Sequence, residues 1–446
     1  MDRRDFIKTS LAAGGALALS SCTLEGNGLQ TGKMEMRIHP ETGEAVSLLG
    51  MSCMPRPLVS MPDAQRNEID QEAVNQLVDY ALEHGVNFFE TAPVNGREGK
   101  EEATAAALLR HPREKYLIAT KLPGPNGNKS LEEGQEMVEN TLSVFQTDHI
   151  DYLSLDFVCN ADDLTVRFLD NGLLDWLLEQ RRNGRIRHLG FSFHGPKEGF
   201  DELLALHGQY HWDFVGIQMN YLDWKHAALT SERPYRMANA EYLYGELEAR
   251  NIPVVAMEPL LGDRLAQLPQ GPVMRLKSRE PERSTAFWAF RFCGSFPHVL
   301  TIVSGMTYME ELQDNIKSVS NFKPLSESEL AFLEETASLI LNFPTIPCTA
   351  CQYCMPCPYG LDIPGIFAHH NECINEDHIP QDAMSPAYRK ARRTYLISYE
   401  RQIPGRRQAA YCVGCGECTL HCPQGINIPV QMRKIDRYTE KLRKNL

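Results

Sequence analysis

Residues 69–92, IDQEAVNQLVDYALEHGVNFFETA, contain one helix pattern followed directly by one strand pattern. In residues 69–85 apolar side chains recur every three or four positions, as they do on one face of a helix. Residues 86–92 begin as a short apolar run, which is typical of a strand buried on both faces. The stretch therefore predicts one α/β unit, with the strand inside and the helix covering it.

The same alternation repeats along most of the chain. Strand patterns are expected at residues 46–51, 86–92, 116–122, 150–157, 186–193, 214–220, 253–260 and 300–306. Helical patterns separate them, for example at residues 131–145 and 242–251. Eight such units predict a closed parallel (β/α)8 barrel, the TIM barrel, and an open doubly wound sheet is the alternative. Ahead of the first unit, residues 34–50 alternate around a Pro-Glu-Thr-Gly turn and predict a hairpin.

The chain has 446 residues, of which 43% are hydrophobic, and this length is sufficient for more than one domain. A helix at residues 327–341 is expected to lead from the barrel into a small, mostly helical domain. The net charge of -13 argues against a nucleic-acid partner, because binding phosphates requires clustered positive charge. The expected segments are a signal peptide at 1–22, a tether at 23–36, the barrel at 37–325, a linking helix at 326–345 and a cysteine-rich domain at 346–446.

Eight of the thirteen cysteines lie in two short runs near the C-terminus. The runs are CTACQYCMPCP at 348–358 and CVGCGECTLHCP at 412–423, and each ends in a Cys-Pro pair. The second run has the full C-x2-C-x2-C-x3-C-P spacing, and the first is one residue shorter before its last cysteine. Three thiolates at this spacing bind three irons of one cubane, while the fourth cysteine, stiffened by its proline, reaches the other cluster. The runs therefore predict a ferredoxin-like domain with two 4Fe-4S clusters.

The expected ligand sets cross between the two runs. One cluster is expected on Cys348, Cys351, Cys354 and Cys422. The other cluster is expected on Cys412, Cys415, Cys418 and Cys357. Zinc is the alternative, because Cys-x2-Cys pairs also suit a tetrahedral zinc ion, but the additional cysteines beside each pair favour iron-sulfur clusters.

The N-terminal 22 residues, MDRRDFIKTSLAAGGALALSSC, have the features of a targeting peptide. Paired Arg3 and Arg4 precede Phe-Ile-Lys, which resembles a twin-arginine export signal. The apolar stretch that follows is shorter than the ~20 residues that a membrane-spanning helix needs. LSSC resembles a lipoprotein cleavage box, which would make Cys22 the lipid-bearing first residue, and a buried amphipathic helix is the alternative. We expect an exported protein, periplasmic or otherwise extracytoplasmic, held at the membrane only by a lipid on Cys22.

Several strings on these α/β units resemble the aldo/keto reductase family. They are GVNFFETAPVNG, ATKL and GRIRHLGFSFHG at strands two, three and five, and IQMNYLD, VAMEPLLGDRLA and IVSGMTYMEELQDN at the last three strand ends. The resemblance runs from about residue 37 to residue 321, and the cysteine domain is similar to the subgroup that carries a C-terminal two-cluster module. It implies a barrel enzyme that reduces carbonyl groups with hydride from a nicotinamide, and a tyrosine that donates the proton.

The resemblance also implies four catalytic positions at the C-terminal mouth of the barrel. Lys121 matches the family's lysine, and Glu90 replaces an aspartate but is still able to pair with Lys121. Asn95 stands in place of the proton-donating tyrosine, and an amide cannot deliver a proton near neutral pH. Asp156 replaces a histidine, where an anion would repel a developing alkoxide. Three of the four positions therefore differ from the pattern of ordinary carbonyl reduction.

The altered positions have their own chemical implication. Glu90 and Asp156 are expected to face Lys121 as a charged cluster with perturbed pKa values, forming either an acid/base set or a metal-binding corner. Two nearby tyrosines, Tyr152 and Tyr221, are candidates for supplying a proton from elsewhere.

The positions that the resemblance implies for a nicotinamide cofactor are mixed. Ser192 and Gln218 match contacts to the carboxamide, and Asn315 matches a contact to the adenine. Met257 stands where many members stack an aromatic ring. Glu311 stands where NADP-preferring members often have an arginine, and a carboxylate repels the 2'-phosphate. We therefore expect NAD to be favoured over NADP.

Two functions are consistent with this sequence. One is an iron-sulfur oxidoreductase acting on an unknown small molecule, with the clusters passing electrons. The other is a non-catalytic electron-transfer or ligand-binding lipoprotein with a degenerate reductase barrel. Hydride carries two electrons and a 4Fe-4S cluster passes one, so the first function needs a step that separates them. A basic stretch at residues 385–407 is expected either to dock an acidic redox partner or to form a solvated helix face.

Overall fold

The computed structural model describes residues 32–53, 57–59, 68–92, 99–122, 130–230, 237–350, 352–376, 378–379, 387–422 and 424–444. The chain divides into two compact units, residues 1–31 and 32–446, and all described residues belong to the second. The predicted signal peptide and lipid site at Cys22, the catalytic candidate Asn95 and the expected cluster ligand Cys351 lie outside the described residues.

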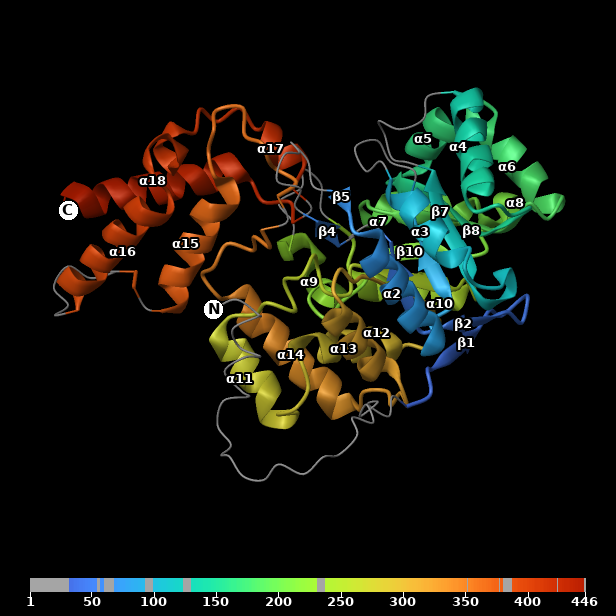
Figure 1. The fold of residues 1–446 in the computed structure, drawn as a ribbon, viewed down its shortest axis with the longest axis horizontal. Helices are drawn as coiled ribbons and strands as arrows, with labels where there is room; N and C mark the ends of the chain where they lie inside the picture. Colours follow the sequence, from blue (N-terminus) through green and yellow to red (C-terminus); the bar gives the residue numbers. More distant parts are fainter. Residues whose placement is uncertain are drawn as a thin grey trace. The chain divides into compact units, whose positions relative to one another are not determined.

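Eight parallel strands close into a barrel (Figure 1). In chain order they are β3 (Leu49–Ser52), β6 (Phe88–Glu90), β7 (Leu117–Leu122), β8 (Ile150–Val158), β9 (Ile186–Phe193), β10 (Val215–Gln218), β11 (Val254–Met257) and β12 (Val299–Gly305). Each strand pairs with the next along the chain, and β12 pairs with β3 to close the ring. The (β/α)8 barrel predicted from the sequence is confirmed, and the doubly wound alternative is wrong.

Helices cover the outside of the barrel. The principal ones are α2 (Gln71–Glu83), α3 (Lys100–Leu108), α4 (Leu131–Val144), α6 (Leu173–Arg182), α7 (Lys197–Ala205), α10 (Ala240–Ala249), α12 (Thr285–Gly294) and α13 (Met309–Val319). Helix α2 begins where the Asp70 side chain accepts a hydrogen bond from the Ala73 N–H, an N-cap that satisfies a backbone donor. The α2 side chains buried against the barrel include Val74, Leu77 and Val78, which belong to the apolar face that the sequence predicted.

Shorter elements lie in the connections. They are β4 (Leu58–Val59), β5 (Glu68–Ile69), α5 (Ala161–Leu164), α8 (His207–Tyr210), α9 (Asp223–Thr230) and α11 (Gln270–Arg279).

Apolar side chains fill the N-terminal half of the barrel interior. They are Val46, Phe88, Leu117, Ala119, Tyr152, Phe214, Val255, Leu300 and Val303. Because this half is packed as a core, we expect a ligand to bind at the C-terminal mouth, where the strand ends and their loops meet.

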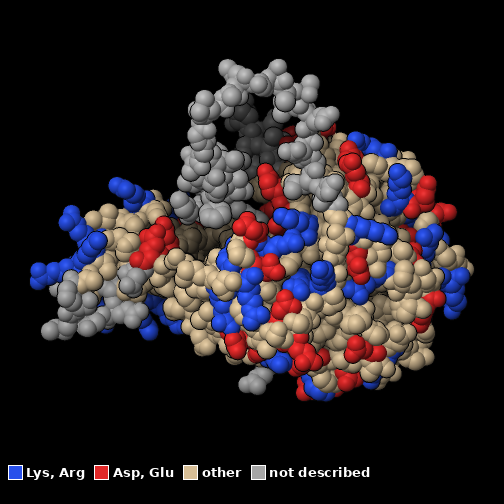
Figure 2. Space-filling view, turned by 90° about the horizontal axis from the view of Figure 1, so that it is seen from below, with Lys and Arg blue, Asp and Glu red and all other residues tan. Residues whose placement is uncertain are grey.

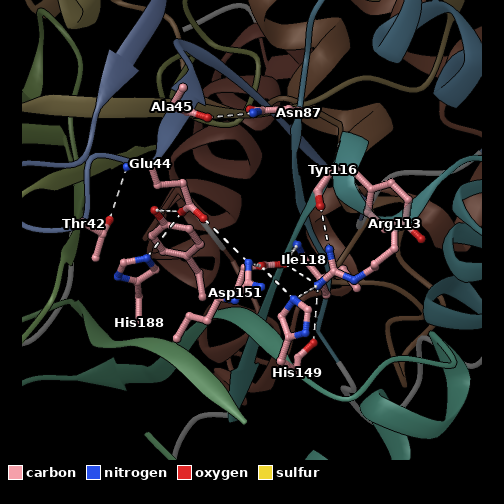
Figure 3. Close-up of polar contacts among 12 residues, drawn as sticks. Thr42, Glu44, Ala45, Asn87, Arg113, Tyr116, Ile118, His149, Asp151 and His188 are labelled. Carbon is pink, nitrogen blue, oxygen red and sulfur yellow. Dashed lines mark hydrogen bonds and ion pairs between the residues drawn. The ribbon is translucent and has the colours of Figure 1, made fainter. Parts of the chain in front are cut away.

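A hairpin lies at the N-terminal end of the barrel, as predicted. Strands β1 (Met36–Ile38) and β2 (Ala45–Ser47) pair antiparallel, and β2 leads directly into β3. Glu44 of this hairpin accepts a hydrogen bond of 2.8 Å from the Tyr152 hydroxyl, and its carboxylate lies 3.4 Å from His188 Nε2 (Figure 3). Tyr152 therefore points away from the C-terminal mouth. Its prediction as a candidate proton donor there is wrong.

A second polar group lies beside this hairpin and closes the same end of the barrel. Asp151 is fully buried and accepts hydrogen bonds from Arg113 Nη2 at 2.6 Å and from the Ile118 N–H at 2.8 Å (Figure 3). Burial alone would raise the pKa of Asp151, but its contacts with His149, Arg113 and Ile118 lower it overall. A buried carboxylate with this many donors is a structural anchor rather than a reactive group.

Glu101 is a buried carboxyl between α3 and α4, and it is 5% exposed. Thr141 Oγ1 donates a 3.0 Å hydrogen bond to it, but burial raises the pKa of Glu101 from 4.5 to about 7. Because the pKa of this carboxyl is higher in the folded state, the protein loses stability as the pH rises from about 4.5 through 7. Glu101→Gln is therefore expected to raise the free energy of unfolding by about 2 kcal/mol at pH 8, with little effect at pH 4. Thermal unfolding of both proteins at the two pH values measures this, and an equal difference at both would contradict it.

The C-terminal part is mostly helical, as predicted. Helix α14 (Glu327–Leu341) begins with a capping box between Ser326 and Glu329. It is followed by α15 (Ile363–Asn375), α16 (Tyr388–Gln402), α17 (Glu417–Leu420) and α18 (Ile428–Lys444). Helices α15, α16 and α18 share a small core, whereas the buried side chains of α14 belong to the barrel core. The small core contains Ile346, Leu361, Ile363, Ile366, Phe367, Tyr399, Ile403, Ala409, Ile426, Ile428, Met432 and Ile435. Within the described residues, no helix has both the length and the apolar character that a membrane crossing requires.

Candidate functional site

Lys121 lies at the C-terminal mouth of the barrel, between two carboxylate-bearing strands. It is on β7, with Glu90 on the neighbouring β6 and Asp156 on β8. Lys121 Nζ is 2.9 Å from Glu90 Oε1, and the two side chains are 18% and 9% exposed. Burial alone would lower the pKa of Lys121, but the charges of Glu90 and Asp156 outweigh it and raise the pKa. The ammonium group is thus held in its charged form inside the mouth.

Asp156 has its own hydrogen-bond partner. Ser192 Oγ on β9 donates to Asp156 Oδ1 at 2.7 Å and accepts a 2.8 Å hydrogen bond from the Phe157 N–H. Arg167 Nη2 donates to the Asp156 backbone oxygen at 2.7 Å. These bonds fix the orientation of the Asp156 side chain and the backbone at the end of β8.

A third carboxylate, Glu258, faces Lys121 from the end of β11. Its backbone φ of 52° is in the left-handed region, and its Oε2 accepts a 2.7 Å hydrogen bond from the Gly262 N–H. Enclosure by the barrel wall raises the pKa of Glu258, against the opposing effects of the Gly262 N–H and the Lys121 charge. The residue is nevertheless exposed to solvent. A carboxyl that is accessible and has a raised pKa is suited to exchange protons with a bound ligand.

Glu258 was not among the site residues predicted from the sequence. The available signal was an acidic residue directly after a predicted barrel strand, the usual place for functional residues in this fold. Tyr221, the second proposed proton donor, is buried in the core with its ring 6.3 Å from that of Phe292.

The carboxylates of the mouth do not gather around a single point as ligands of one metal ion would. Among the described residues, the one group of His, Cys, Asp and Glu side chains whose ligand atoms all lie within 4.8 Å of each other is Glu41, His211 and Asp213. These residues precede β3 and β10, at the opposite end of the barrel. The described carboxylates of the mouth thus do not form such a group by themselves.

Three residues proposed to contact the nicotinamide lie on adjacent strands. Ser192 on β9 pairs with Gly216 of β10, and Gln218 of β10 pairs with Met257 of β11. A side-chain carbon at Gly216 would lie only 3.2 Å from the Met257 sulfur, so the glycine leaves room for this methionine. The three candidate cofactor side chains are thus brought together on one wall of the mouth.

Gln218 is already hydrogen-bonded within the protein. Its Nε2 donates to Asp223 Oδ2 at 2.6 Å, and Asn220 Nδ2 donates to the same oxygen at 2.7 Å. The Gln218 amide oxygen has no partner among the described residues and can accept a hydrogen bond from a carboxamide. The positions therefore fit a nicotinamide only in part, since the Ser192 hydroxyl and the Gln218 amide nitrogen are engaged by carboxylates.

Two further cofactor candidates lie on α13. Asn315 is 4% exposed. Glu311 accepts hydrogen bonds from the Thr307 N–H at 2.9 Å and the Tyr308 N–H at 3.3 Å, which cap the start of the helix. The Glu311 carboxylate is therefore fixed at the helix N-terminus, where a phosphate would otherwise bind favourably.

The last cysteine of each run lies with the other run. A cavity is lined by Cys357 together with Cys412, Cys415 and Cys418. Burial, followed by the charges of Cys415, Cys412 and Cys357, raises the pKa of the Cys418 thiol to about 11. Four thiols around one cavity match the donor set of a 4Fe-4S cluster, which thiolates bind.

The remaining described cysteines of the two runs, Cys348, Cys354 and Cys422, line a second cavity. The remaining wall is largely apolar and includes Ile363 and Phe367. The described residues thus form the crossed arrangement expected from the sequence, and both cavities fit the clusters by their donor atoms.

The second cavity adjoins the barrel. Gln424, two residues after Cys422 and 4% exposed, also lines this cavity, and its Nε2 donates a 3.0 Å hydrogen bond to the Leu261 backbone oxygen. Leu261 precedes Gly262, whose N–H bonds Glu258. A short chain of hydrogen-bonded and covalently linked residues therefore joins this cysteine set to the barrel mouth. Sequence patterns gave no signal for this contact.

Family comparisons place known domains on the same segments. A model of the aldo/keto reductase family matches residues 60–338, more than half of the chain. A model of a 4Fe-4S dicluster domain matches residues 347–427, and one of the TAT (twin-arginine translocation) pathway signal sequence matches residues 1–20. These matches confirm the resemblance, the two-cluster domain and the export signal that the sequence predicted.

Individual proteins agree with the family models. A probable voltage-gated potassium channel subunit beta from Arabidopsis thaliana is 24% identical over 313 residues, which cover 60% of this chain and 88% of that protein. The holo form of an aldo-keto reductase from Bacillus halodurans is 21% identical with a TM-score of 0.53, covering 68% of this chain and 96% of that one. An aldo-keto reductase from Klebsiella pneumoniae in complex with NADPH is 20% identical with a TM-score of 0.51, covering 68% and 94%. At these identities the solved structures show that the fold is shared.

Proposed function

Because this chain belongs to the aldo/keto reductase family, we propose that it is an exported iron-sulfur oxidoreductase whose small-molecule ligand binds in the barrel mouth around Lys121. The observation that carries this proposal is the ion pair of 2.9 Å between Lys121 and Glu90 at the carboxyl ends of β7 and β6. A buried ion pair at this position costs desolvation energy, and a ligand-binding role explains why it is placed there.

Acid/base chemistry in this site is assigned to Glu258. Its raised pKa and its accessible side chain support exchange of a proton with the ligand, while Lys121 stabilises developing negative charge. The clusters, when bound, supply one-electron steps, and the cysteine set next to Gln424 lies on the side that contacts the barrel.

The cofactor proposed for the mouth is a nicotinamide, with NAD favoured over NADP. The Klebsiella reductase of the same fold is in complex with NADPH, which supports a dinucleotide in this place. The fixed Glu311 carboxylate at the start of α13 argues against a 2'-phosphate there.

Calorimetric titration of the anaerobic, cluster-loaded protein tests this proposal. Micromolar binding of NADH, with weaker binding of NADPH, is expected. Glu311→Gln keeps an acceptor for the helix cap but removes the charge, so it is expected to improve NADPH binding relative to NADH by about fivefold. No binding of either nucleotide, with clusters intact and no copurified cofactor, would contradict the nicotinamide proposal.

A second candidate function is a non-catalytic electron-transfer or ligand-binding protein with a reused barrel. This function is favoured because the two residues matched to the nicotinamide carboxamide already bond to carboxylates of the protein. Ser192 donates a hydrogen bond to Asp156, and Gln218 donates one to Asp223. An Asn95→Tyr and Asp156→His double variant discriminates between the two candidates. Gain of carbonyl reductase activity supports an intact cofactor site, whereas no gain with bound nucleotide favours the non-catalytic function.

We also propose that the mature protein is lipid-anchored at Cys22 outside the cytoplasm. The LSSC string directly after the twin-arginine signal supports this. Cys22→Ser is expected to move the protein from the membrane fraction to the soluble fraction of the same compartment, and unchanged membrane association would contradict the anchor.

A further inference from the structure

The two cysteine sets of the C-terminal domain have different surroundings. The set containing Cys422 adjoins Gln424, which is buried against the barrel loop at Leu261. The other set includes Cys415, which is exposed, and its cavity is also lined by Tyr359 and Val413. One cluster position is therefore directed toward the barrel, and the other is close to solvent.

Apolar side chains surround the solvent-facing set. Tyr359 is 52% exposed, Tyr411 is 50% exposed and Val413 is 60% exposed. Tyr411 and Val413 flank Cys412 directly in sequence. Neighbouring exposed aromatic and aliphatic residues are characteristic of the centre of a protein interface.

Basic side chains lie at the edge of these apolar residues. A side-chain carbon at Gly414 would lie 3.4 Å from Arg433 Nη1, which places this exposed arginine beside the Cys412 to Cys415 loop. Arg406 and Arg407 are exposed just before Tyr411, and Arg407 pairs with Asp362 at 2.9 Å. Glu417 is the one acidic residue in the sequence of the second cysteine run, residues 412–423.

The charge of the domain differs from that of the rest of the chain. Residues 346–446 contain 13 Lys and Arg against 9 Asp and Glu, whereas residues 1–345 contain 32 against 49. Figure 2 shows several Lys and Arg side chains on the C-terminal domain, at the left of the view. Two clusters with their thiolate ligands would offset this small positive excess, so an acidic protein is repelled less by this domain than by the remainder of the chain, and its attraction is local to the exposed arginines.

We propose that an acidic one-electron carrier protein docks on the face formed by Tyr359, Tyr411, Val413, Arg406 and Arg433. The apolar residues provide the contact, and the arginines select and orient the partner. A reduced carrier docked here would lose one electron to a cluster held by Cys357, Cys412, Cys415 and Cys418. That cluster would be reoxidised by passing the electron to the cluster on the barrel side. This inference rests on the electron-passing role of the clusters under the proposed function, but not on the identity of the barrel ligand.

Stopped-flow reduction of the full-length, cluster-loaded protein by an acidic flavodoxin hydroquinone tests this docking face. One electron passes to the protein and leaves the flavodoxin as its semiquinone, so both partners report the transfer optically. The second-order rate constant is expected to fall as salt concentration rises. Arg406→Glu and Arg433→Glu are each expected to lower it by about fivefold at low ionic strength, and Val413→Glu is expected to lower it as well.

Arg182→Glu, an exposed arginine of α6 on the barrel, is the matched control and is expected to leave the rate unchanged. Iron content and reduction by the methyl viologen radical, which needs no docking face, show that each variant is loaded. Unchanged rates in all three face variants, or an equal loss in Arg182→Glu, would overturn the proposal. Binding of the protein to phosphatidylglycerol vesicles through Arg406 and Arg433, without any interaction with flavodoxin, would also overturn the proposal. Nucleotide plays no part in these measurements, so a failed NADH titration leaves their outcome interpretable.

Discussion

Cys415→Ala is expected to lower the iron content from about eight to about four atoms per chain, because one of the two clusters loses a ligand. Cys357→Ala is expected to remove the same cluster, although Cys357 belongs to the other sequence run, since both residues line one cavity. Cys422→Ala is expected to remove the other cluster. Iron and sulfide analysis, with electron paramagnetic resonance of the reduced protein, measures each loss.

Pairs of substitutions make the crossed assignment testable. The Cys357 and Cys415 double variant is expected to keep about four irons, as each single variant does, whereas the Cys357 and Cys422 double variant is expected to keep none. If the pair Cys354 and Cys357 instead behaves as one unit, each run binds its own cluster and the crossed arrangement is refuted. Retention of zinc in place of iron would support the zinc alternative.

Lys121→Met is expected to lower the free energy of unfolding of the barrel by about 3 kcal/mol at pH 8, because it leaves Glu90 buried without its cation. The loss is expected to be smaller at pH 5.5. Glu258 has a raised pKa that the Lys121 charge partly offsets, and removing that charge raises it further. A carboxyl with a raised folded-state pKa destabilises the protein increasingly as the pH rises, so acidification restores part of the stability.

Thermal unfolding is followed by near-ultraviolet circular dichroism, and visible absorbance recorded in parallel identifies the part of the signal that comes from loss of the clusters. Lys121→Arg, which keeps the charge, is the control and is expected to lose less than half as much stability. An unchanged midpoint in Lys121→Met at pH 8 would show that the ion pair contributes little, and would weaken the case for a preorganised charged site.

The sequence was sufficient to predict the barrel because its signals are local and repeated. Six of the eight strand runs, such as residues 150–157, begin and end within two residues of the observed strand, and the eight repeats leave few alternatives. The cysteine spacing was equally informative, because ligand geometry requires closely spaced donors. The pairing of Lys121 with Glu90 followed from their expected places at the ends of adjacent strands.

The features that were not predicted depend on contacts between distant parts of the chain. Tyr152 was considered for the mouth, but it lies four residues before Asp156 on a parallel strand and therefore belongs to the N-terminal end. The orientation of Glu258 depends on a left-handed backbone at the end of β11, which its sequence does not indicate. The bond between Gln424 and Leu261 joins residues 163 positions apart and has no local pattern.

The crossed cysteine sets have a consequence for how the domain matures. Cys357 lies with the later run and Cys422 with the earlier one. Each bound cluster would therefore cross-link the two runs and close a loop of more than fifty residues. Cross-links that close long loops remove much of the chain entropy of the unfolded state, and metal binding is then coupled to folding. The small apolar core of this domain contributes less than a large one would. Neither cross-link can form before the final run has been synthesised, so we expect both clusters to be inserted late in biosynthesis and before passage through the twin-arginine route.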